Sequence, residues 1–228
     1  MLTSLAVVIG VLIAFELLAL LWLATSVGSY KKYWQQQNTT SDGELLYVAL
    51  GDSTAQGIGA SRARKSYVGL VADALARDSG ASVKIINLSV SGAKVQDVTR
   101  DQLHQLQDLP LDDKTLITLA IGANDMRTFD EITFRKDTDE LLSQLPPQTG
   151  VADVPYFGGG RFRRLESNVT KANTIIHQLV RKHDLRLVPL HEITKDRDSL
   201  LVYSADLFHP SNIGYKNWAD AFVQALDI

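Results

Sequence analysis

The stretch LLYVALGDST, residues 45–54, decides the fold. It has six consecutive apolar residues, followed by a glycine and a polar turn. This pattern is typical of a short strand that is buried on both faces of a parallel sheet. Similar apolar runs follow later in the chain, at residues 83–88, 115–121 and 185–190. The sequence therefore predicts a sheet built from several short parallel strands.

Stretches with helical periodicity separate these strands. Apolar residues recur every three or four positions over residues 67–78, 95–106 and 165–183. A last helix is expected after Ser211, whose hydroxyl can cap it, with aromatic and aliphatic residues along one face. Alternation of strands and helices predicts an α/β domain with a central parallel sheet. In such domains, ligand sites form outside the carboxyl ends of the strands.

The segment 145–164 is less regular than the rest of the chain. It contains two adjacent prolines and a glycine triplet, and a strand over residues 150–154 is the one regular element we expect there. The remainder is expected to form an irregular loop beside the site. Three arginines lie at its end: Arg161, Arg163 and Arg164. A solvated loop is the simplest interpretation of these arginines, and contact with lipid head groups or an acidic substrate is the alternative.

The N-terminal residues have a different composition from the domain. From Leu5 to Val27 the only charged residue is Glu16, and a helix of this length, about 35 Å, spans a bilayer core. We expect residues 1–30 to form a single-pass transmembrane anchor. Tyr30, together with Tyr33 and Trp34, suits the membrane interface. Cleavage of the segment after Ala24-Thr25-Ser26 is the alternative.

A polar stretch follows this segment. The sequence QQQNTTSDG, residues 35–43, lacks apolar periodicity, so residues 31–43 are expected to form a flexible linker to a catalytic domain at residues 44–228. Lys31 and Lys32 favour a cytoplasmic domain by the positive-inside rule. Two lysines do not fix the side of the membrane.

Composition limits the classes of function. The 228 residues include no cysteine, which excludes a disulfide framework, a thiolate nucleophile and a cysteine-ligated zinc site. A net charge of -3 gives no basic surface to attract nucleic acid. Gly57 and Gly59 follow the first strand, but neither a P-loop nor a dinucleotide-binding spacing is present. We therefore expect a monomeric catalytic domain that needs no cofactor or metal and binds no nucleic acid.

Small and polar residues follow three of the predicted strands, and they include a candidate nucleophile. Ser53 comes directly after the first strand, where Gly51 allows a sharp turn. A serine nucleophile needs a base and a group that orients the base. In Asp206-Leu-Phe-His209, the three-residue offset places carboxylate and imidazole on one side of a turn. We therefore expect Ser53, His209 and Asp206 to form a catalytic triad.

Candidate donors to a tetrahedral oxyanion can also be named. Gly92 follows the second strand and can offer its backbone N–H without a side chain in the way. Asn124 follows the third strand and can offer its amide N–H, and the backbone N–H of Ser53 completes the set. Asp52 and Asp125 are expected to brace their loops rather than to take part in the chemistry.

These blocks resemble the four sequence blocks of the SGNH/GDSL hydrolase family, in the same order. The matching blocks are Gly51-Asp52-Ser53, NLSVSG at residues 87–92, Gly122-Ala-Asn124-Asp125 and Asp206-Leu-Phe-His209-Pro210. The resemblance implies a three-layer, flavodoxin-like fold and hydrolysis of esters or thioesters through an acyl-serine. It also implies the roles given above for Ser53, Gly92, Asn124, Asp206 and His209. Thr54 stands where leucine is usual in the family.

Three functions remain open at this stage. A membrane anchor favours small-molecule or lipid esters, so esterase, lipase, lysophospholipase or thioesterase activity is expected first. Removal of acetyl groups from a cell-surface glycan is the second. A catalytically silent binding module tethered to the membrane is the third, and the intact set of five functional residues argues against it.

Overall fold

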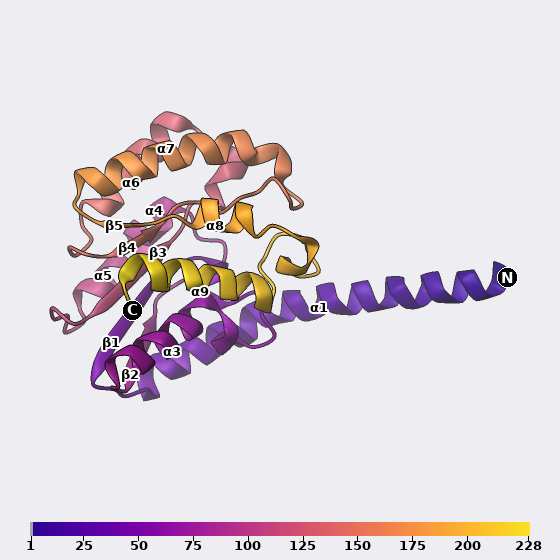
Figure 1. Ribbon diagram of the computed structural model, residues 1–228, viewed down its shortest axis with the longest axis horizontal. Helices are drawn as coiled ribbons and strands as arrows, with labels where there is room; N and C mark the ends of the chain where they lie inside the picture. Colours follow the sequence, from indigo (N-terminus) through magenta and orange to yellow (C-terminus); the bar gives the residue numbers. More distant parts are fainter. Residues whose placement is uncertain (1) are drawn as a thin grey trace.

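The centre of the molecule is a parallel sheet. The computed structural model describes the backbone of residues 2–228 and the side chains of residues 10, 14 and 16–228. Five strands lie in the order β2-β1-β3-β4-β5 (Figure 1), and every neighbouring pair is parallel. The strands are β1 (Leu45–Gly51), β2 (Val83–Asn87), β3 (Leu116–Ala120), β4 (Gly150–Ala152) and β5 (Arg186–Val188).

In this order, strands are added on both sides of β1. The chain passes from β1 to β2 on one side and then returns to β3 on the other. The order of strands therefore reverses between β1 and β3, and ligands of such sheets bind at the carboxyl ends of the strands at that point. The polar loops that begin with Gly51 and Gly122 follow these two strands.

Nine α-helices and four 3-10 helices connect and cover the strands in the described part of the chain. The α-helices are α1 (Leu2–Thr40), α2 (Ser53–Gln56), α3 (Tyr67–Ser79), α4 (Val95–Asp101), α5 (Leu103–Gln107), α6 (Glu131–Leu142), α7 (Glu166–Lys182), α8 (Leu190–Asp196) and α9 (Asn212–Leu226). The 3-10 helices are η1 (Ala63–Lys65), η2 (Asp125–Thr128), η3 (Arg163–Leu165) and η4 (Leu200–Val202).

The helices form one layer on each face of the sheet. Helices α4, α5, α6 and α7 bury their apolar residues against one face. Helices α3, α8 and α9, with Trp34 of α1, bury theirs against the other (Figure 1). The predicted α/β fold with a central parallel sheet, covered on both faces, is confirmed.

Local sequence explains most of these boundaries. The Ser66 hydroxyl accepts a hydrogen bond from the Gly69 N–H at the start of α3, and that of Ser211 accepts from Ile213 and Gly214 at the start of α9. The single helix predicted over residues 95–106 is divided into α4 and α5 at Gln102. Helices α6 and α8 were not predicted. The segment 145–164 contains only the three-residue strand β4 and the start of η3.

The segment that was expected to form a flexible linker is mostly helical. Residues 31–40 continue α1, and the helix packs on β2 and α2 (Figure 1). Trp34 is 2% exposed, and its indole N–H donates to the Gln56 carbonyl over 3.0 Å. The Tyr30 hydroxyl donates to the Ala60 carbonyl over 2.7 Å. These aromatic residues therefore attach α1 to the domain, whereas the sequence had suggested a membrane interface.

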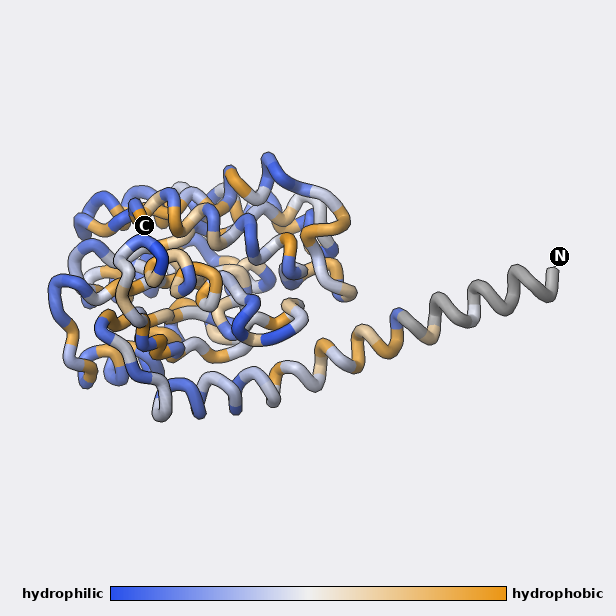
Figure 2. Tube along the Cα trace, turned by 60° about the horizontal axis from the view of Figure 1, so that its bottom comes forward, coloured by the Kyte–Doolittle hydropathy of each residue, from blue (hydrophilic) through white to orange (hydrophobic). Residues whose placement is uncertain are grey.

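A polar contact near the end of α1 explains why the helix is ordered so far. The Asn38 amide donates to the Asn87 carbonyl and its oxygen accepts the Asn87 N–H, at 3.0 and 2.8 Å. Residues 35–40 are polar because they lie on the surface of the domain, and this contact comes from a strand that is distant in the sequence. Figure 2 shows the change along α1 from apolar to polar residues toward its C-terminal end.

The predicted transmembrane helix covers residues 5–27, and some of its side chains are outside the part of the chain that the structure describes. In the part of the chain that the structure describes, no helix combines the length and the apolar character needed to cross a membrane. The described residues therefore do not support the transmembrane anchor.

Candidate active site

The candidate nucleophile lies in a tight turn at the carboxyl end of β1. Gly51 has φ 147°, and a Cβ there would collide with the Ala120 carbonyl of β3, so glycine is required. Asp52 caps α2 by accepting the Thr54 N–H over 2.9 Å, and Ser53 is the first residue of that helix. The loop thus holds Ser53 at the edge of the sheet.

A buried glutamine fixes the backbone of this turn. The Gln102 side chain, which is fully buried, accepts the Gly51 N–H over 3.0 Å and donates to the Gly51 carbonyl over 2.9 Å. Both backbone groups are therefore satisfied at the point where β1 leaves the sheet. The sequence analysis did not identify Gln102, because its partner is about fifty residues away.

The structure brings the three predicted triad residues together. The Ser53 Oγ lies 2.9 Å from His209 Nε2, and His209 Nδ1 lies 2.6 Å from Asp206 Oδ2. The other oxygen of Asp206 accepts the backbone N–H groups of Phe208 and His209 at 3.1 and 3.0 Å. Leu207, between Asp206 and Phe208, has φ 54°, a conformation that costs about 1–2 kcal/mol for a residue with a Cβ. This turn aims the carboxylate at the imidazole.

Asp206 is held in its ionised form. Burial acts to raise the pKa of its carboxyl, but the hydrogen bond and positive charge of His209, with the two backbone N–H groups, lower it to about 2. A carboxylate that stays charged near neutral pH can orient the imidazole and stabilise it when it takes up a proton.

The candidate oxyanion donors lie around the nucleophile. Ser53, Gly92 and Asn124 all line one cleft. Among the residues that the structure describes, no acceptor takes the backbone N–H of Ser53 or of Gly92. These two groups are therefore available to a substrate oxygen. Gly92 has φ 82°, and nothing lies within 4 Å of the place where a Cβ would be.

Asn124 is placed in the cleft, but its amide already has partners. The Nδ2 group donates to Asp52 Oδ2 over 3.2 Å and to the Ala93 carbonyl over 3.0 Å. The bond to Asp52 is the longer one. A substrate oxygen would have to compete with these acceptors for an Asn124 proton, so the oxyanion role of this side chain stays a prediction.

The two acidic residues beside the site brace its loops. Burial raises the pKa of Asp52, and the hydrogen bonds from Thr54 partly offset this rise. The Thr54 hydroxyl donates to Asp52 over 2.8 Å, a bond that leucine at this position could not make. Burial also raises the pKa of Asp125, to about 6, although its carboxylate accepts the Val95 N–H. Their positions agree with the supporting roles expected for them.

The cleft that contains the candidate triad has a volume of about 400 Å³ and extends beyond these three residues. The N-terminal helix contributes to its lining, through Leu23, Ala24 and Val27. Residues from η2 and from the loop after β4 complete the outer part: Arg127, Phe157, Arg161, Phe162 and Leu165. Contact of Arg161 with a substrate was one of two interpretations of the sequence, and the loop at residues 145–164 was expected beside the site, but the contributions of α1 and η2 were not predicted. These lining residues come from segments that only the three-dimensional fold brings together.

Three aromatic rings connect the base to this outer part. The Phe208 ring lies edge-on to the imidazole of His209, with centroids 5.0 Å apart. It also lies edge-on to Phe157 and Phe162, at 5.7 and 4.9 Å. Such edge-to-face contacts are favourable for aromatic pairs. The position of His209, the candidate base, is therefore linked to the loop at residues 157–162.

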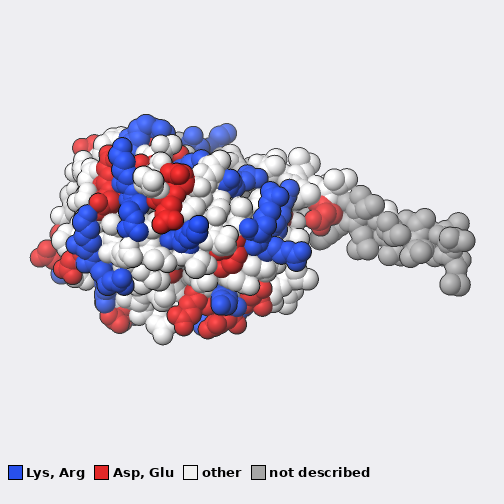
Figure 3. Space-filling view, turned by 90° about the horizontal axis from the view of Figure 1, so that it is seen from above, with Lys and Arg blue, Asp and Glu red and all other residues white. Residues whose placement is uncertain are grey.

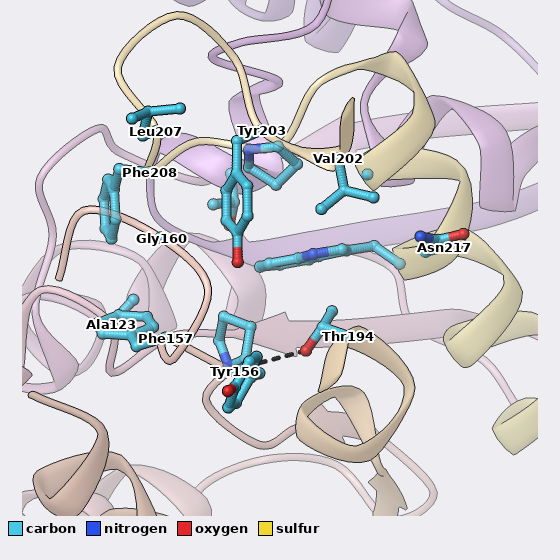
Figure 4. A pocket seen from close by; sticks show the side chains of 15 residues that line it. Ala123, Tyr156, Phe157, Gly160, Thr194, Val202, Tyr203, Leu207, Phe208 and Asn217 are labelled. Carbon is cyan, nitrogen blue, oxygen red and sulfur yellow. Dashed lines mark hydrogen bonds between the residues drawn. The ribbon is translucent and has the colours of Figure 1, made fainter. Parts of the chain in front are cut away.

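A second cavity lies on the other side of Phe208. Figure 4 shows Tyr203, Val202 and Leu207 on one side of it and Tyr156 and Thr194 on another. Its volume is about 50 Å³, which is room for a few water molecules. It does not contain the triad residues, so the larger cleft is the candidate substrate site.

Comparison with known proteins identifies the family. Residues 49–216 match the model of the GDSL-like Lipase/Acylhydrolase family, and the chain belongs to that family. This confirms the resemblance drawn from the four sequence blocks. The matched residues include Ser53, Gly92, Asn124, Asp206 and His209.

Individual relatives are more distant. The chain is 24% identical over 238 residues to YpmR of Bacillus subtilis (strain 168), an uncharacterized protein, covering 92% of this chain and 93% of YpmR. The acetylxylan esterase Axe2 from Geobacillus stearothermophilus has a similar structure, with a TM-score of 0.61 and 17% identity over 80% of this chain and 94% of Axe2. Phospholipase A1 from Streptomyces albidoflavus NA297 is also similar in structure, with a TM-score of 0.60 and 20% identity. The match covers 81% of this chain and 100% of the phospholipase. These structures share the fold.

Proposed function

We propose that this protein is a serine hydrolase that cleaves carboxylic esters or thioesters through an acyl-serine intermediate. The observation that carries the proposal is the continuous set of contacts from Ser53 Oγ to His209 and on to Asp206, at 2.9 and 2.6 Å. A hydroxyl, an imidazole and a carboxylate in this arrangement can activate the serine for attack on a carbonyl carbon.

In the first half of the reaction, the Ser53 Oγ attacks the carbonyl carbon and its proton moves to His209 Nε2. Asp206 accepts the Nδ1–H and stabilises the imidazolium. The tetrahedral intermediate then expels the alcohol or thiol, which takes the proton from Nε2, and the acyl group stays on Ser53.

In the second half, water attacks the acyl carbon and gives its proton to His209. The bond to Ser53 Oγ breaks, the serine recovers its proton, and the carboxylic acid leaves. The sum is one ester and one water converted to one acid and one alcohol. The free N–H groups of Ser53 and Gly92 can stabilise the negative oxygen in both halves, and the Asn124 amide can join them if it leaves one present acceptor.

Labelling with a fluorophosphonate probe tests the proposal. The wild-type protein is expected to take up one label at Ser53 and to hydrolyse p-nitrophenyl acetate or butyrate. Ser53→Ala is expected to lose the label and about 10⁴-fold or more of the rate, because the nucleophile is gone. A wild-type protein that takes up no label, or a Ser53→Ala variant that labels equally, would contradict the proposal and favour a silent binding module.

The substrate class requires a separate comparison. Phospholipase A1 and Axe2 share this fold, and their names concern lipids and acetylated xylan respectively. Turnover of p-nitrophenyl esters with increasing chain length, beside release of acetate from acetylated xylan or peptidoglycan, distinguishes the two. Activity confined to acetyl groups on sugars would favour the O-acetylesterase alternative.

A further inference from the structure

The N-terminal helix forms part of the catalytic cleft. Val27 lies three residues after Ala24 and four after Leu23 on α1, and all three line the cleft that contains Ser53. Leu23 is half-buried and Val27 is 37% exposed. These residues therefore present an apolar surface next to the reacting serine.

This surface has a fixed position relative to the nucleophile. One to two turns further along α1, Tyr30 and Trp34 donate to the backbone carbonyls of Ala60 and Gln56. Gln56 is the last residue of α2, the short helix that begins with Ser53. The contact between α1 and α2 thus sets the distance between the apolar residues of α1 and the serine.

Two cations line the same cleft. The guanidinium groups of Arg127 and Arg161 both lie over the Phe162 ring, at 4.9 and 5.7 Å from its centroid. Cation–π contacts of this kind hold a charged group in place. Figure 3 shows that Lys and Arg side chains are spread over this face of the domain, and some of them lie at the end from which α1 projects.

Both cations are attached to the catalytic loops. Arg127 follows Asn124 by three residues in η2, and the backbone N–H of Arg161 donates to the Leu207 carbonyl over 2.8 Å. Within the described part of the chain, neither guanidinium forms an ion pair. The acidic residue that lines the cleft, Asp206, is occupied by His209. An anionic group of a substrate therefore has two unpaired partners there.

We propose that this cleft selects esters that carry both an apolar chain and an anionic group. Leu23 and Val27 of α1 contact the chain, and Arg127 and Arg161 bind the anion. The N-terminal helix then helps to determine which substrates the enzyme accepts. This inference rests on the proposed serine hydrolase function and adds the chemistry of the substrate to it.

Matched substrates test the cationic half. Monooctanoylglycerol and its 3-phosphate share an acyl chain and differ in the anion, and both are used as monomers at low concentration. The wild-type kcat/KM is expected to be about tenfold higher for the phosphate, and this preference should shrink at high salt. Arg127→Gln/Arg161→Gln should remove the preference. Arg163→Gln/Arg164→Gln, whose residues lie outside the cleft, should keep it.

Chain length tests the apolar half. Each methylene buried against α1 should raise kcat/KM by about threefold, from p-nitrophenyl acetate to octanoate, until the contact is complete. Leu23→Ser/Val27→Ser should reduce the ratio of octanoate to acetate turnover by at least tenfold. Leu17→Ser/Leu21→Ser is the matched control, because both of these leucines are 61% exposed on the same helix and lie outside the cleft.

The outcomes separate the two proposals. If Ser53 labels with fluorophosphonate and short esters turn over, but neither charge nor chain length is discriminated, the selectivity is wrong and the hydrolase function stands. Equal effects of the cleft variants and their controls would also overturn the selectivity. Absence of label and turnover in the wild-type protein would overturn the hydrolase function itself.

Discussion

The two walls of the catalytic cleft are built in different ways. The inner wall holds Ser53 at the start of α2, Gly92 and Asn124 in loops at the carboxyl end of the sheet, and His209 just before α9. The outer wall combines α1, η2 and the loop that follows β4. Side chains of the inner wall are mostly tied by hydrogen bonds, whereas those of the outer wall meet through apolar and cation–π contacts.

This difference teaches how the chemistry and the selectivity of the site are divided. Hydrogen-bonded loops at strand ends fix reacting atoms to a few tenths of an ångström, as proton transfer and oxyanion stabilisation require. Apolar surfaces are less directional and adapt to a chain. Changes to the inner wall should therefore alter the rate of reaction. Changes to the outer wall should alter stability or the choice of substrate.

The largest effect in the outer wall should follow from removing the attachment of α1. Trp34→Ala deletes a side chain that is 2% exposed and that packs with the core beneath α3 and α9. The free energy of unfolding should fall by about 3–5 kcal/mol, as measured by urea denaturation.

The matched control for this change is Trp22→Ala on the same helix, where the ring is 43% exposed. Its cost should stay below about 1 kcal/mol, because this ring belongs to neither of the two buried clusters. If the two variants were equally stable, α1 would not be docked as described, and the apolar part of the outer wall would lose its support.

The inner wall was easier to predict from sequence than the outer wall. Ser53, Gly92 and Asn124 each lie within a few residues of a strand that apolar runs reveal, and Asp206 and His209 are three residues apart. Parallel strands then bring these loops to one edge without further information. The roles of the five residues remain predictions that labelling and kinetics can check.

The outer wall depends on contacts that no local pattern encodes. The polar sequence of residues 35–43 predicts a linker over residues 31–43, yet Asn38 is bonded to Asn87 of β2 and residues 31–40 are helical. Helix α6 was missed for a different reason. Half of its residues are charged, although Phe134, Leu141 and Leu142 have helical spacing and Asp130 caps it, and these signals could have revealed it.

A smaller effect, confined to the inner wall, should come from Asn124→Ala. If the amide reaches the oxyanion in the transition state, kcat and kcat/KM should fall together by about 10²–10³, or roughly 2.7–4 kcal/mol. Steady-state kinetics with p-nitrophenyl butyrate measure both constants.

The present partners of Asn124 offer a second interpretation of that variant. Its amide donates to Asp52 and to Ala93, so a purely structural role would appear as lost stability. A variant that unfolds more easily but keeps its kcat would contradict the oxyanion role. It would leave the N–H groups of Ser53 and Gly92 as the donors.

The smallest effect should be the different pH dependence of the stability that Asp206 and Asp125 contribute. Asp206 has a pKa of about 2, so it stays ionised and contributes stability at all pH values above about 4. Asp125 has the opposite shift, because burial raises its pKa from 3.8 to about 6. The folded state then holds this proton more tightly than the unfolded state, and stability falls as pH rises from about 4 to 6.

Asp125→Asn removes that titration and keeps an acceptor for the Val95 N–H. Relative to the wild type, the variant should gain about 1–2 kcal/mol between pH 4 and pH 8, after allowance for partial exposure of the side chain. Urea denaturation at the two pH values measures the difference, and Asp130→Asn, at an exposed helix cap, is a control whose pKa shift has the opposite direction. A constant difference between Asp125→Asn and the wild type would show that Asp125 is already ionised without cost, and that the inner wall is more open to water than its hydrogen bonds indicate.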